Sequence, residues 1–182
     1  MALHTVGHGT LSAERFGELL EGAGLDQVVD VRSFPGSRHN PQYAREAMER
    51  WLPEAGLRYA WLPALGGRRK PHPGSPHTAL RNDAFRAYAD HMETDEFHRG
   101  LEELVDGVEL DRAVVMCSES VWWRCHRRLL ADHLVLVDER DVVHLMHDGR
   151  QTPHPITEGA RRDGRRVVYD VGTTAPLELP AD

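Results

Sequence analysis

The sequence contains only two cysteines and no Cys-x-x-Cys motif. A disulfide framework needs more cysteines, and a structural zinc site usually needs paired ligands at short spacing, so both are disfavoured. There is also no run of 18 apolar residues and no charged-then-apolar secretion signal. Internal repeats and low-complexity tracts are missing too. We therefore expect a reduced, soluble, cytoplasmic protein without a membrane partner.

The bulk composition limits the number of domains and the class of partner. With 182 residues, 40% of them hydrophobic, the chain is long enough for one domain with its own core and short for two. We predict a single domain over residues 1–182. The formal net charge is −7, so overall charge does not favour duplex nucleic acid, although a local basic patch can still bind it.

Short apolar runs alternate with segments of helical periodicity. Strands are expected at 3–6, 25–31, 57–62, 113–116 and 142–145, with one more strand-like piece at 167–169. Helices are expected after Ser12, after Pro41, over 85–92 and 97–105, and again after 128. Such alternation favours a parallel sheet. The predicted fold class is α/β: a three-layer single domain with a mostly parallel sheet of about five strands flanked by helices.

Two segments fall outside this alternation. One is a long basic loop rich in glycine and proline at about 63–77, and the other is a Pro-rich C-terminal extension at about 149–182. Loops of this length in a compact domain are usually functional or disordered.

Both cysteines lie between the strand at 113–116 and the next helix, in a stretch that also holds Glu119, His126 and Arg127. In open α/β sheets, ligands bind beyond the carboxyl ends of the strands. A helix start and adjacent cations favour the thiolate, which makes Cys125 a candidate nucleophile or redox thiol; packing as a small hydrophobe is the alternative. Cys117 can face the crevice or the core. Glu119 is a candidate general acid or base, or an ion-pair partner of a nearby arginine.

A second polar segment follows the strand at 25–31. Arg32 and Arg38 are suited to bidentate recognition of phosphate or carboxylate, and Ser37 adds a hydroxyl donor. This pattern indicates an anionic ligand. The alternative for the first arginine is an ion pair with Asp30 that fastens the end of the strand.

A third segment, Gly7-His8-Gly9, ends the first strand. Its glycines permit close backbone approach, and the helix after Ser12 presents free N–H groups that favour an anion. His8 and His4 are four residues apart, but they are not on a helix, so no metal site is predicted. A phosphatase-type loop is also excluded, because Trp123 occupies the position of its arginine.

Several motifs, spread over most of the chain, resemble those of one bacterial protein family, the domain of unknown function 488. They are Thr5-Val6-Gly7-His8, Asp30-Val31-Arg32 with Pro35, Ser37 and Arg38, Tyr59, Leu65-Gly66-Gly67, Phe85 and Tyr88, Cys117-Ser118-Glu119, Cys125-His126-Arg127, His144-Leu145, and His154-Pro155-Ile156-Thr157 ahead of Arg161. Gly9 stands where the family usually has Ser, and Ser118 where Ala is more usual. The family's name carries no function, so the resemblance implies a fold and a set of motif positions that could share one crevice.

The leading hypothesis is a small enzyme that acts on an anionic, phosphate-bearing or nucleotide-like substrate, with no cofactor defined. The catalytic candidates are Cys117, Glu119, His8, Cys125 and His126. The substrate-binding candidates are Arg32, Ser37, Arg38, Arg127, Tyr59, Gly66 and Gly67.

Three alternatives stay open. In a rhodanese-like or thiol redox protein, a cysteine thiolate would carry sulfur or cycle with the second cysteine, but the Gly- and Arg-bearing loop that follows the rhodanese cysteine is missing. A nucleic-acid-binding module would use Arg68-Arg69-Lys70 with Trp61 and Trp122-Trp123 as stacking partners. A haem or metal-dependent enzyme is the third, because His and Cys ligands can converge from distant segments.

Overall fold

The computed structural model describes residues 2–36, 38–70 and 72–172. Its strands are β1 (Ala2–Gly7), β2 (Gln27–Asp30), β3 (Arg58–Trp61), β4 (Ala113–Cys117), β5 (Asp141–Leu145), β6 (Gln151–Pro153), β7 (Ala160–Asp163) and β8 (Arg166–Tyr169). Its α-helices are α1 (Ala13–Gly22), α2 (Arg45–Glu54), α3 (Asp83–His91), α4 (Asp95–Gly107) and α5 (Arg127–Leu136). Short 3-10 helices are η1 (Pro41–Tyr43), η2 (Pro63–Leu65) and η3 (Trp122–Arg124).

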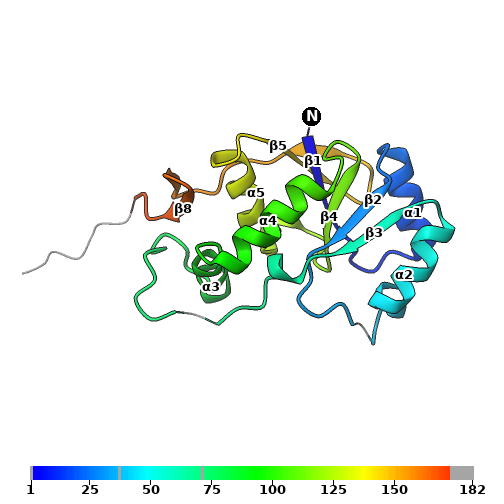
Figure 1. Ribbon diagram of the computed structural model, residues 1–182, viewed down its shortest axis with the longest axis horizontal. Helices are drawn as coiled ribbons and strands as arrows, with labels where there is room; N and C mark the ends of the chain where they lie inside the picture. The colour runs from blue at the N-terminus through cyan, green and yellow to red at the C-terminus, as the bar shows by residue number, and fades with distance from the viewer. Residues whose placement is uncertain (1, 37, 71, 173–182) are drawn as a thin grey trace, which may run out of the picture.

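A six-stranded sheet in the order β3-β2-β4-β1-β5-β6 forms the centre of the molecule. The pairs among the first five strands are parallel, and only β6 runs antiparallel to its neighbour. The predicted α/β fold with a mostly parallel sheet is therefore confirmed. Strands β7 and β8 form a separate antiparallel hairpin near α5 (Figure 1).

Helices cover both faces of the sheet (Figure 1). The residues of β2 and β4 are all buried, as expected for central parallel strands. Helices α1 and α2 pack on one face through Phe16, Leu20, Met48 and Leu52. Helices α3, α4 and α5 pack on the other through residues that include Tyr88, Phe97, Leu104 and Leu130. Each large apolar side chain buried in this way contributes roughly 1.5–3 kcal/mol.

The helix predicted after Pro41 begins later than expected. Pro41 starts the single 3-10 turn η1, and α2 begins only at Arg45. Ala44 separates the two because its backbone is extended, with φ −63° and ψ 143°. By contrast, the helix predicted after Ser12 is confirmed, since the Ser12 hydroxyl caps α1 by accepting a hydrogen bond from the N–H of Arg15.

Candidate functional site

A cavity of about 530 Å³ lies beyond the carboxyl ends of β2 and β4. The chain leaves β2 towards α2 on one face of the sheet and leaves β4 towards α5 on the other. Connections that diverge from adjacent parallel strands open a crevice at the sheet edge. The lining residues are His8, Gly9, Arg32, Ser33, Phe34, Gly36, Asn40, Gly67, Arg68, Ala84, Phe85, Cys117, Ser118, Glu119, Arg124, Cys125 and His126.

This cavity brings together all five of the predicted catalytic candidates. A hollow of similar volume, about 510 Å³, lies between α1 and α2 at the other edge of the sheet. Its lining includes none of the predicted site residues. We therefore place the candidate site at the carboxyl ends of β2 and β4.

The two thiols are in contact at the inner end of this cavity. Cys117 is the last residue of β4 and Cys125 lies two residues before α5, yet their sulfur atoms are 2.7 Å apart. Only 2% of Cys117 and 6% of Cys125 is exposed. Their spacing in the sequence is not a known redox or metal motif, so the sequence suggested cycling between the two cysteines only within an alternative hypothesis and did not predict their contact.

The fold treats the two thiols differently. Burial and the hydrogen bond to Cys125 raise the pKa of Cys117 well above its usual value. Burial also raises the pKa of Cys125, but the hydrogen bond from Cys117, the charge of Arg127 and the backbone N–H of Arg127 outweigh it and lower the pKa to about 7. Cys125 is therefore the thiol that ionises first, at the start of α5 where the helix N-terminus favours an anion.

Arg127 supports the thiols from inside the protein. Its Nη1 donates to the Cys117 sulfur at 2.5 Å and to the carbonyl oxygen of Glu119 at 2.6 Å, and its Nη2 donates to the carbonyl oxygen of Ser120 at 3.1 Å. Arg127 is 2% exposed and does not line the cavity. The sequence predicted that it binds substrate; the structure gives it a positioning role, fixing the turn that follows β4.

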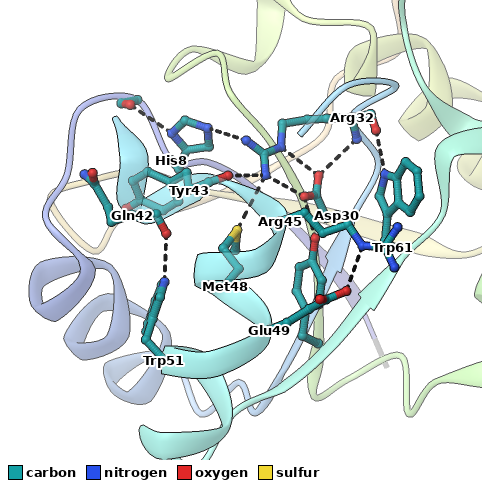
Figure 2. Close-up of polar contacts among 12 residues, drawn as sticks. His8, Asp30, Arg32, Gln42, Tyr43, Arg45, Met48, Glu49, Trp51 and Trp61 are labelled. Carbon is teal, nitrogen blue, oxygen red and sulfur yellow. Dashed lines mark hydrogen bonds and ion pairs between the residues drawn. The ribbon is translucent and has the colours of Figure 1, made fainter. Parts of the chain in front are cut away.

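Arg32 is anchored on its inner side by a buried carboxylate (Figure 2). Its Nε and Nη2 donate to the two oxygens of Asp30 at 2.8 and 2.6 Å, and Nη2 also donates to the carbonyl oxygen of Tyr43 at 2.8 Å. Because Arg32 also lines the cavity, the ion pair holds a cation at the cavity wall in a fixed orientation. The sequence offered the ion pair with Asp30 as an alternative to ligand binding by Arg32. In the structure Arg32 forms this ion pair and also lines the cavity.

His8 lies between Arg32 and the ring of Tyr43 (Figure 2). Its Nδ1 donates to the carbonyl oxygen of Gly9 at 2.9 Å, so Nε2 is the acceptor for Arg32 Nη1 at 3.2 Å. The imidazole stacks on Tyr43 with ring centres 3.9 Å apart. Burial lowers the pKa of His8 to about 4, and the charge of Arg32 adds to this effect. His8 is thus neutral at pH 7.

The remaining polar side chains lie nearer the mouth. Glu119, Arg68 and Arg124 are exposed and line the cavity. Arg68 lies over the ring of Phe34, which is 72% exposed, at 6.0 Å from its centre. Arg32, Arg68 and Arg124 therefore stand against two carboxylates, Asp30 behind Arg32 and Glu119 in the lining, and the remaining positive charge favours an anion.

Two predicted glycines permit the loop after β3 to approach the site closely. A Cβ on Gly67 would collide with the ring of His126, and one on Gly66 would collide with Ser33. His126 lines the cavity with its Nδ1 3.5 Å from the sulfur of Cys125, and burial lowers its pKa. The two glycines thus allow close packing of this loop against Ser33 and His126. Of the two, Gly67 lines the cavity and Gly66 does not.

Two other predicted residues do not line the cavity, and a third is not among the described residues. Tyr59 instead donates its hydroxyl hydrogen to Asp30 at 2.9 Å, which supports the carboxylate that holds Arg32. Arg38 is exposed and lies outside the lining. Ser37 lies outside the described residues.

A separate buried network, missed by sequence reasoning, links β1, β5 and α5. Thr5 Oγ1 and His144 Nδ1 are 2.7 Å apart, His144 Nε2 and His154 Nδ1 are 2.9 Å apart, and His154 Nε2 lies 2.9 Å from Asp132. Asp132 also accepts from the Tyr169 hydroxyl at 2.9 Å. None of these side chains lines the cavity, so the network fastens the C-terminal hairpin to α5.

Two of the predicted nucleic-acid stacking rings are covered by other side chains. Trp122 stacks on His144 with ring centres 4.3 Å apart, and the guanidinium of Arg45 lies over Trp61 at 4.3 Å. Only Trp123 among the three rings is exposed.

Within the described part of the chain, no three His, Cys, Asp or Glu side chains are grouped so that they could hold a metal ion. No helix among residues 2–36, 38–70 and 72–172 is both long and apolar enough to cross a membrane.

Comparison with known proteins identifies a family for the chain. Residues 12–134 match the family model described as Domain of unknown function DUF488. That range holds the segments around Arg32, Gly67, Cys117 and Cys125, in agreement with the resemblance in the sequence motifs. No curated protein and no solved structure matches the chain.

Proposed function

We propose that this chain, which belongs to the family of Domain of unknown function DUF488, is an enzyme that uses a cysteine thiolate on a small anionic substrate. One observation carries the proposal: the low-pKa thiol of Cys125 and the guanidinium of Arg32 line the same cavity. A nucleophile and an anion-binding group in one cavity are the minimum set for thiol catalysis on an anion.

Arg32 is the anchor for the anion. Asp30 and Tyr43 accept hydrogen bonds from Nε and Nη2. Nη1 has two protons, and His8 accepts one of them, so within the described hydrogen bonds the other is available to a ligand. Arg68 and Arg124 add charge at the mouth. A phosphate-bearing or nucleotide-like molecule suits this cavity, since Arg32 can donate its remaining Nη1 proton to a phosphate oxygen and Phe34 and Phe85 offer apolar rings beside it.

Cys125 is the proposed nucleophile and Glu119 the proposed proton carrier. At pH 7 a thiol with a pKa of about 7 is about half thiolate. Glu119 is exposed at the same cavity, so it can exchange protons with solvent and substrate. His8, held neutral, accepts from Arg32 and so orients it. A reduced thiol pair also suits a reducing compartment, and we propose a cytoplasmic location on that ground.

Alkylation of the thiols tests the proposal. The rate of iodoacetamide labelling, followed by peptide mass mapping, should rise to half its maximum near pH 7 at Cys125. Inorganic phosphate or pyrophosphate should slow the labelling, and Arg32→Lys should weaken that protection. Arg58→Lys is the matched control, because Arg58 pairs with Asp26 outside the cavity. A labelling midpoint near the free-cysteine value of about 8.5, with no protection by either anion, would contradict the proposal.

A further inference from the structure

We infer that Cys125 and Cys117 act as a two-electron dithiol–disulfide couple, and that the substrate of the site is a small anionic disulfide. The choice of an anionic partner rests on the proposed function, whereas the couple itself rests on the contact between the thiols. The sulfur atoms are 2.7 Å apart at the inner end of the cavity, a separation that leaves no room for another group between them. Formation of a disulfide therefore needs only a small movement of one side chain.

The surroundings assign a different role to each thiol. Cys125 is the more exposed of the two and lies at the start of α5, so it is the thiol that attacks a substrate in the cavity. Cys117 lies deeper, at the end of β4, within reach of Cys125 and in contact with the guanidinium of Arg127. Arg127 stabilises negative charge on Cys117, which assists this thiol when it loses its proton in the second step.

The reaction has two balanced steps. In the first, the Cys125 thiolate attacks one sulfur of a disulfide R–S–S–R′; a mixed disulfide with R forms, the substrate S–S bond breaks, and R′S⁻ leaves and takes up a proton. In the second, Cys117 gives up its proton and attacks the Cys125 sulfur; the protein disulfide forms and RS⁻ leaves and takes up that proton. Two electrons pass from the protein to the substrate. A low-molecular-weight thiol is the class of reductant that returns the protein to the dithiol.

The cavity selects the substrate by charge. Arg32, Arg68 and Arg124 line the same cavity as Cys125, while Asp30 behind Arg32 and Glu119 in the lining supply two negative charges, so positive charge remains in excess. A disulfide with carboxylate groups would place them on these guanidinium groups while its sulfurs reach the thiols.

The experiment compares an anionic disulfide, oxidised glutathione, with a neutral one, hydroxyethyl disulfide, on the full chain. Intact mass after oxidation should fall by two hydrogens, and peptide mapping should assign the new bond to Cys117 and Cys125. The anionic disulfide should react about ten-fold faster at low salt, and added salt should reduce the difference. Cys117→Ser should stop at a stable mixed disulfide on Cys125, and Cys125→Ser should react slowly with both reagents.

The outcomes separate the two proposals. Failure of both disulfides to oxidise the wild-type thiols would overturn the redox couple, while the alkylation experiment still tests the thiolate enzyme. Equal rates with the two reagents would overturn the anionic substrate class. Because the wild-type peptide map decides the first point and the wild-type rates decide the second, the inference remains testable even where a cysteine variant fails to fold.

Discussion

At the residue scale, the buried carboxylate of Asp30 determines how Arg32 is presented. Asp30 is fully buried and receives hydrogen bonds from Arg32 and from the hydroxyl of Tyr59. The sequence predicted a polar segment at the end of the strand, and it offered ligand binding and an internal ion pair as alternatives. Both apply to Arg32, because a guanidinium has enough donors to serve the carboxylate on one side and the cavity on the other.

We expect Asp30→Asn to lower the free energy of unfolding by roughly 3 kcal/mol, since it leaves Arg32 buried without its countercharge. It should also weaken protection of Cys125 by phosphate, because the orientation of Arg32 is lost. Urea unfolding and the alkylation assay measure the two effects.

Asp26→Asn is the matched control, because Asp26 pairs with the exposed Arg58 and Arg112 at the other edge of the sheet. Exposed pairs contribute little, so the control should show a much smaller loss and unchanged protection. Equal losses of unfolding free energy in the two variants would show that the buried Asp30–Arg32 pair contributes no more than an exposed pair.

The contact between Cys117 and Cys125 shows where sequence reasoning ends at this scale. Each cysteine was a predicted site residue, since a strand end and a helix start are recognisable from periodicity. Their contact depends on the path of residues 118–126, which Arg127 fixes through backbone carbonyl oxygens. No spacing rule encodes such a path, because it arises from one buried side chain closing a turn.

At the element scale, the strongly patterned strands were predictable and the weakly patterned ones were not. β4 is a run of apolar residues between charges, and it was predicted almost to its ends. β6 and β7 were missed because their sequences, Gln-Thr-Pro and Ala-Arg-Arg-Asp, lack alternation and are mostly exposed. These strands exist through pairing with β5 and β8, which is a tertiary effect that overrides local preference.

The end of β1 and the turn after β4 are in backbone contact at Gly7. A Cβ there would collide with the carbonyl oxygen of Glu119. We expect Gly7→Ala to push this turn outward, to lower stability by on the order of 2 kcal/mol or more, and to slow oxidation of the thiols. Thermal unfolding and the disulfide assay check the two results.

Gly17→Ala is the control for this prediction. Gly17 lies inside α1, and a Cβ there meets nothing within 4 Å. Alanine is preferred over glycine in a helix by up to about 1 kcal/mol, so this variant should gain stability and oxidise normally. A Gly7→Ala protein that behaves like Gly17→Ala would rule out the proposed backbone contact.

At the scale of the whole molecule, buried neutral histidines make stability depend on pH. Burial lowers the pKa of His8 and His133 to about 4, and that of His144 to about 3. Because the unfolded chain has histidine pKa values near 6.5, it binds more protons than the folded chain between about pH 6.5 and 4. The contribution of these histidines to the free energy of unfolding should therefore be constant above about pH 7 and fall as the pH decreases through this window, by roughly 3 kcal/mol per buried histidine.

His133 allows this dependence to be tested separately from the site. Within the described part of the chain, neither of its ring nitrogens has a hydrogen-bond partner, and it packs against Phe97. We expect His133→Leu to lose less stability between pH 7 and 4.5 than the parent in urea titrations. The control is His39→Gln, a change at an exposed residue, which should keep the parent's slope. If the free energy of unfolding of His133→Leu depends on pH as strongly as that of the parent, His133 does not contribute to this pH dependence.

The position of β1 in the sheet has a consequence for how the protein is made. β1 precedes every other described strand in the chain, yet His4 pairs with Val114 of β4 and Val143 of β5, so neither partner exists until most of the chain has been synthesised. Pairings this distant slow folding, because a long segment must close before they form. Cys117 and Cys125 emerge from the ribosome before β5 and therefore spend that interval without the burial they have in the finished sheet. The newly synthesised chain, more than the folded protein, is the form in which these two thiols are open to uncontrolled oxidation.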